Sequence, residues 1–150
     1  MIGQFCLDKD IINFASDNTS GVDLEIFSVV EQAAKSSAMP YGDDVFTSKL
    51  QIIANEIFEK PVSIFPVATG SAANALALSV ICPPYGSVYC HRESHLEEDE
   101  CAAPEFYIGG GKLSLLSGEK AKFSAENLKA KLEVKSPAPP IHHSPAAAVS

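Results

Sequence analysis

Apolar residues recur every three or four positions in three segments of the chain, which predicts three amphipathic helices. The segments are residues 23–37, 44–59 and 124–132. In the first, the repeating apolar residues are Leu24, Phe27, Val30 and Ala34. Each segment begins at or just after a residue that can cap a helix: Asp23, Asp43 or Asp44, and Ser124. The adjacent aspartates could instead hold a metal or form an acid/base pair, but no second ligand cluster is in register, which favours the cap.

The middle of the chain has a different pattern, in which short apolar runs alternate with turns. Residues 62–67 are apolar and rich in β-formers, residues 68–71 are small, and residues 72–81 are rich in alanine and leucine. A double proline and a glycine then precede a second β-rich run at 87–91. Strand, helix and strand at this spacing predict parallel pairing with a right-handed crossover.

The last third of the chain has weaker signals. Residues 102–112 are expected to form a turn-rich bridge, and residues 112–116 a third short strand. The triple glycine at 109–111 is not a dinucleotide fingerprint, because it does not lie between a strand and a helix. The chain ends where a further strand could begin. The whole pattern predicts an α/β fold.

Two places in this pattern are candidates for chemistry. The turn at Gly70 and Ser71 opens a helix, whose first N–H groups lack partners and attract anions. The alternative is an ordinary turn with a Ser/Thr cap. His95 follows the strand at 87–91, so it is expected on the same rim as the turn, where α/β sheets bind ligands. The alternative is a solvated histidine beside a solvated acidic run at 97–100.

Composition narrows the classes of function. The chain has 150 residues, enough for one domain with a real core, and a net charge of −8 with a single arginine. This charge argues against nucleic acid and against an anionic membrane surface as partners. No apolar run approaches the ~18 residues of a membrane span, and no signal peptide is evident. The four cysteines lack metal-type spacing, so we expect no metal, reduced thiols and a cytoplasmic location.

Five segments, in order along the chain, resemble a known family. They are residues 14–22 (FASDNTSGV), 41–44 (YGDD), 69–74 (TGSAAN), 95–106 (HLEEDECAAPEF) and 141–142 (IH). Together they are similar to the N-terminal half of the low-specificity L-threonine aldolases. That family belongs to the β-eliminating lyases with the aspartate-aminotransferase-type fold, which use pyridoxal 5′-phosphate (PLP). The resemblance implies part of a fold-type-I large domain, with three α/β/α layers and a mainly parallel, truncated sheet.

The resemblance also implies roles for particular residues. Gly70 and Ser71 match the turn that holds the PLP phosphate, and His95 matches the histidine that stacks on the pyridine ring. Ser16 matches a position near the substrate carboxylate, and His142 a second histidine near the substrate β-hydroxyl. The implied reaction cleaves Cα–Cβ of L-threonine or a related β-hydroxy amino acid into glycine and an aldehyde. A histidine near neutral pKa suits the proton transfer that this cleavage needs.

The departures from the family bear on activity. None of the lysines matches the motif that binds PLP covalently, so we expect the 150-residue chain alone to have no aldolase turnover. Residues 1–22 are expected to form an N-terminal arm, and residues 23–150 a partial PLP-binding domain. A sheet left incomplete has an exposed edge, which favours a homo-oligomer or association with a full-length homologue. The alternative to a lyase fragment is a catalytically incompetent paralogue that acts as such a partner.

Overall fold

The computed structural model describes residue 16 and residues 19–133 and 141–150. The chain divides into two compact units, Met1–Ile64 and Phe65–Ser150. Residues 11–15, an apolar run that predicts a strand or an extended entry segment, lie outside the described residues. The domain boundary expected after residue 22 stays a prediction.

The described part of the first unit contains the two helices expected there. Helix α1 is Leu24–Ala34, and the Asp23 carboxylate accepts a hydrogen bond from the Glu25 N–H at 2.8 Å. Helix α2 is Val45–Ile57. Both helices are thus confirmed within a few residues of their expected ends.

Asp44 is the N-cap of α2. Its Oδ1 accepts from the N–H groups of Phe46 and Thr47 at 2.8 Å, and its Oδ2 from the Thr47 hydroxyl at 2.7 Å. The Thr47 hydroxyl, followed by these backbone donors, lowers the pKa of Asp44 below its ordinary value. The capping interpretation of the two aspartates is therefore confirmed for Asp44. Among the described residues, no group of three or more histidine, cysteine or acidic side chains could hold a metal ion.

The strand expected at residues 62–67 is wrong, because the structure has no strand in this stretch. The Val62 N–H donates to the Asn55 side chain at 2.9 Å, and the Gln51 amide donates to the Val62 carbonyl. Pro66 has no N–H to give to a ladder. Side chains of α2 thus satisfy backbone groups that a neighbouring strand would otherwise pair, and the expected βαβ unit does not form around α3.

The second unit is built on a three-stranded parallel sheet of order β2-β1-β3. Strand β1 is Ser87–His91, β2 is Lys112–Leu116 and β3 is Ala146–Val149. Strand β1 pairs with β2 from Ser87 opposite Lys112 to His91 opposite Leu116. Its pairing with β3 is irregular between Ser87 and Val88. All five residues of β1 are buried, as expected for a central parallel strand covered on both faces.

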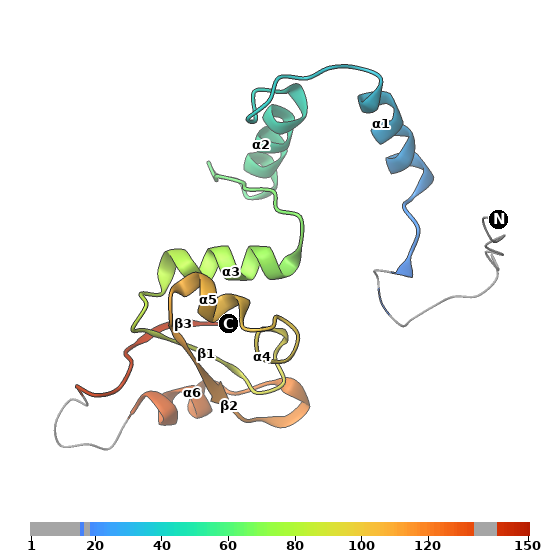
Figure 1. Ribbon diagram of the computed structural model, residues 1–150. Coiled ribbons are helices and arrows are strands. Elements are labelled where there is room, and N and C mark those ends of the chain that lie inside the picture. Colours follow the sequence, from blue (N-terminus) through green and yellow to red (C-terminus); the bar gives the residue numbers. More distant parts are fainter. Residues whose placement is uncertain (1–15, 17–18, 134–140) are drawn as a thin grey trace, which may run out of the picture. The chain divides into compact units, whose positions relative to one another are not determined.

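Helices cover both faces of this sheet in three layers. Helix α3 is Gly70–Ile81, α5 is Ala103–Ile108 and α6 is Ala125–Leu132. Figure 1 shows α3 and α5 on one side of the strands and α6 on the other. The core lies under α3 and α5 and also includes side chains of β1 and of the short helix α4 (His95–Glu98). Its members are Leu78, Cys82 at the C-cap of α3, Val88, Leu96 and Ile108. The expected three-layer α/β arrangement with a parallel sheet is therefore confirmed. Among the described residues, no helix is both long and apolar enough to cross a bilayer.

The bridge expected at residues 102–112 is wrong over most of its length, since it contains α5. Pro104 lies in the first turn of α5, where its fixed φ and missing N–H cost nothing, and its side chain is buried. Gly109, at φ 82°, ends the helix in the left-handed conformation. The triple glycine therefore begins with a helix terminator, and α5 with the short helix α4 (His95–Glu98) connects β1 to β2.

The remaining elements follow their local signals. Ser124 and Asn127 form a reciprocal capping box at the start of α6, with the Asn127 N–H donating to Ser124 Oγ at 3.2 Å. A short 3₁₀ turn at Glu119–Ala121 precedes it. The end of the chain, where only the start of a further strand was expected, contains strand β3.

Candidate functional site

The N-terminus of α3 is an open turn with unpaired donors. Thr69 is the N-cap, and its hydroxyl accepts from the Ala72 N–H at 3.1 Å. Gly70 and Ser71 are the first two residues of the helix, so their N–H groups have no partner within it. A Cβ built on Gly70 would meet nothing within 4 Å, so an anion can approach this backbone closely.

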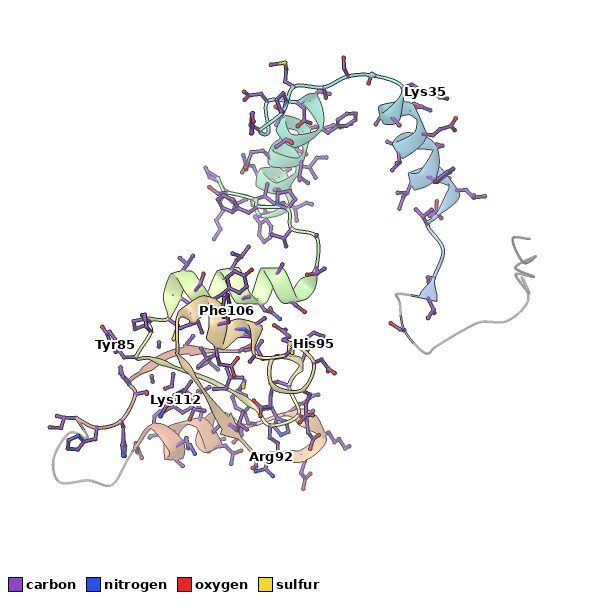
Figure 2. All side chains as sticks on the ribbon, viewed as in Figure 1. Lys35, Tyr85, Arg92, His95, Phe106 and Lys112 are labelled. Atoms are coloured by element: carbon purple, nitrogen blue, oxygen red, sulfur yellow. The ribbon has the colours of Figure 1, made fainter. Side chains whose placement is uncertain are left out.

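His95 begins α4, four residues after the last residue of β1. It therefore lies beyond the carboxyl end of the central strand, the end at which open α/β sheets bind ligands. Its side chain is 61% exposed. The imidazole is therefore accessible to a ligand. Figure 2 shows His95 near the end of α3 at which that helix begins.

Glu100 joins His95 to α3. Its Oε1 lies 2.8 Å from His95 Nδ1 and accepts a hydrogen bond from Asn74 Nδ2 at 2.6 Å. Asn74 lies four residues after Gly70, one turn into α3. The three side chains Asn74, Glu100 and His95 therefore form a network that fixes the histidine relative to the first turns of α3. We call it the His95 network.

The acidic run at 97–100 is not simply a solvated helix face. Glu97, Glu98 and Asp99 are exposed, but the Glu100 side chain is 0% exposed. Sequence reasoning missed this carboxylate, because Glu100 lies beyond α4 and no periodicity separates it from its three exposed neighbours. For Asn74 the sequence contains a weak indication of a specific partner, because asparagine is unfavourable inside an alanine-rich helix.

A cysteine next to this site is structural. Cys90 is the fourth residue of β1 and is fully buried. Burial, together with the negative charges of Glu97 and Glu105, raises the pKa of its thiol. A thiol kept neutral in this way is a poor nucleophile, so Cys90 contributes packing rather than reactivity.

The structure does not bring His142 to His95 within one chain. His142 precedes β3 and lines a cavity of about 520 Å³ together with Ser87 and Lys112, the first residues of β1 and β2. This cavity is therefore at the amino ends of the strands, whereas His95 lies beyond the carboxyl end (Figure 2). The four steps along β1 alone separate the two ends by about 13 Å.

Ser16 belongs to the first unit, and the histidines and α3 to the second. Its carbonyl accepts hydrogen bonds from the N–H and the hydroxyl of Thr19, at 3.1 and 2.7 Å. The structure thus places Ser16 in a local turn. Its expected position near a substrate carboxylate stays a prediction.

Comparison with known proteins gives one consistent result. The family model described as "Beta-eliminating lyase" matches residues 13–150. Low-specificity L-threonine aldolases from Pseudomonas aeruginosa and from a Pseudomonas species are 38% and 39% identical to this chain over 116 residues. A solved threonine aldolase structure from Leishmania major has a TM-score of 0.77 at 20% identity, and the match covers 87% of this chain and 37% of that chain.

The fold thus belongs to a class of parallel α/β proteins related to threonine aldolase in architecture. The chain is a member of the β-eliminating lyase family. It spans about a third of the length of the two curated relatives, since the matches cover 77% of this chain and 34% of each of those proteins.

Proposed function

We infer that this chain provides part of a PLP site, the part that holds the cofactor phosphate and one face of its ring. The reaction served by that site is cleavage of Cα–Cβ in threonine or a related β-hydroxy amino acid. The inference rests on membership of the β-eliminating lyase family and on the names of the two aldolase relatives. When bound, PLP supplies the electron sink that such a cleavage requires.

The residues at the N-terminus of α3 suit a phosphate. Gly70 and Ser71 offer two N–H groups without intrahelical partners, the Ser71 hydroxyl lies beside them, and no Cβ fills the space at Gly70. With a net charge of −8, the chain has no general attraction for anions, so the local helix dipole must provide it. The phosphate is thus held by backbone donors rather than by a basic patch.

His95 suits the ring. Its imidazole is exposed, yet one ring nitrogen is bound to the buried Glu100, so the plane of the ring is fixed before a ligand arrives. A flat aromatic surface in a fixed orientation can stack on a pyridine ring. The His95 network is the observation that carries the proposal, because it fixes this surface relative to the turn at Gly70.

The substrate contacts are also part of the proposal. Ser16 is assigned to the substrate carboxylate, and His142 to the proton of the β-hydroxyl. Because His142 lies at the amino ends of the strands, we assign its action to the site of a second chain, either another copy or a full-length homologue. The cofactor half of the site and the β-hydroxyl contact then come from different chains.

The experiment is an equilibrium titration of the purified chain with PLP and, separately, with pyridoxal, which lacks the phosphate. We expect PLP to bind at least about tenfold more tightly, since one charge-assisted hydrogen bond contributes about 1.5–3 kcal/mol. Equal affinity for the two ligands, or binding of neither, would contradict the proposal. Borohydride reduction after PLP loading distinguishes covalent binding through a lysine from non-covalent binding. None of the lysines matches the family's covalent motif, so we expect no labelled lysine.

A further inference from the structure

We propose that Glu100 and Asn74 are positioning residues that keep a proton on His95 Nδ1 and leave Nε2 as a free acceptor. Neither residue touches the ligands assigned above; both act through His95. The role of Nε2 in the site rests on the proposed function. The tautomer of the His95 ring does not depend on that function, and it can be measured without PLP.

The geometry divides the imidazole into a buried edge and an exposed edge. Nδ1 lies 2.8 Å from Oε1 of a carboxylate that is 0% exposed, whereas the histidine side chain as a whole is 61% exposed. An ionised carboxylate only accepts hydrogen bonds, so the nitrogen facing it must carry the hydrogen. In a neutral imidazole, a hydrogen on Nδ1 leaves a lone pair on Nε2.

Asn74 supports the role of Glu100 Oε1 as an acceptor. The amide of Asn74 donates to the same Oε1 that contacts His95, at 2.6 Å. Two donors meeting at one oxygen fit an atom that accepts both hydrogens, since a proton on Oε1 would compete with the Asn74 hydrogen. The other oxygen, Oε2, is buried without a hydrogen bond in the described part of the chain. Whether or not Oε2 carries a proton, Oε1 accepts both hydrogens, so the hydrogen between Glu100 and His95 lies on Nδ1.

The consequence for the site is a hydrogen-bond acceptor at a defined atom. Nε2, on the ring edge away from Glu100, can accept a hydrogen bond from the ligand or from a water next to it, while the proton of the substrate β-hydroxyl stays assigned to His142. Because Asn74 lies one turn into α3, the same network links this acceptor to the turn that holds the phosphate. Glu100 and Asn74 therefore set both the tautomer and the position of His95.

Nitrogen-15 NMR of the full chain with labelled histidine tests the proposal without PLP. The spectra are recorded with rising pH until the ring nitrogen shifts no longer change, and these limiting shifts report the tautomer. A His95→Phe variant identifies the His95 signals. We expect the Nδ1–H tautomer to predominate in the wild-type chain. A predominant Nε2–H tautomer in the wild-type chain would overturn the proposal, with no variant needed.

Three variants add a graded test. Glu100→Leu removes the acceptor, and we expect the ratio of Nδ1–H to Nε2–H to fall at least about tenfold. Glu100→Gln keeps a carbonyl oxygen, which Asn74 orients toward His95, so the Nδ1–H tautomer should persist. Glu98→Gln, an equal change of charge at an exposed neighbour, should leave the ratio unchanged. An unchanged ratio in folded Glu100→Leu would contradict the positioning role.

The outcome is independent of the cofactor proposal. If the chain has the Nδ1–H tautomer but binds PLP no better than pyridoxal, the positioning role stands and the proposed function fails. If PLP is preferred but the tautomer is Nε2–H, the proposed function stands and the roles of Glu100 and Asn74 fail.

Discussion

Replacing Gly70 by aspartate is expected to abolish PLP binding while leaving the chain at least as stable. The new carboxylate would occupy the N–H groups assigned to the phosphate and repel a second anion, and like charges at such a distance cost several kcal/mol, or about 100-fold or more in affinity. The helix should tolerate the change, because Gly70 has open space around its Cβ position and an acid in the first turn of a helix is favourable by about 0.3–1 kcal/mol. Binding and stability should thus change in opposite directions.

A matched control is Ala125→Asp, which adds the same charge in the first turn of α6. It should leave the PLP affinity unchanged, so that a general effect of negative charge is separated from a local one. PLP affinity would be measured by titration and stability by thermal unfolding. Wild-type affinity in Gly70→Asp would place the phosphate away from α3.

The second large effect is on folding. Leu78→Ala is expected to destabilise the second unit by about 2–5 kcal/mol, the usual cost of a leucine removed from a packed core. Leu78 is 6% exposed and joins α3 to Val88 of β1 and Ile108 of α5. Urea unfolding measures the loss. Because α3 also carries Gly70 and Asn74, the same variant should weaken PLP binding in proportion to the unfolded fraction.

Val80→Ala on the opposite side of α3 is the control for this prediction. Val80 is 84% exposed, so its truncation should change the free energy of unfolding by no more than about 0.5 kcal/mol. Equal effects of the two substitutions would mean that α3 is not held on the sheet by the face that the structure shows.

The elements that the sequence predicted correctly have local signals. Helices α1, α2, α3 and α6 each have a capping side chain and an apolar or alanine-rich run, and each of these signals is complete within about a dozen residues. Strand β1 was also recognisable, because Val88, Tyr89 and Cys90 form a β-rich run shortly after a double proline and a glycine.

The two errors of secondary structure come from interactions outside the local window. Residues 62–67 have the composition of a strand, but hydrogen bonds from Gln51 and Asn55 take the backbone groups of Val62. Residues 103–108 have a proline at their second position and are followed by three glycines. Proline and glycine in this order mark a turn and a short helix equally well. What decides in favour of α5 is the burial of Ile108 against α3 and β1, a tertiary contact.

The candidate site was predictable only in part. The turn at Gly70 and the place of His95 after β1 follow from the order of elements and from the rule that ligands bind at the carboxyl ends of strands. The link between them did not follow, because Asn74 and Glu100 are 26 residues apart and Glu100 lies among exposed acids. The separation of His142 from His95 depends on the register of β3 against β1, which no local pattern specifies.

The most direct test of the central claim is to map PLP onto the chain by NMR. A nitrogen-15-labelled chain would be titrated with PLP, and the change in each backbone amide and histidine ring signal recorded. The largest changes are expected at the amides of Gly70 and Ser71 and at the ring of His95. Changes confined to the cavity lined by Lys112, Lys131 and His142, with none at the start of α3, would contradict the claim.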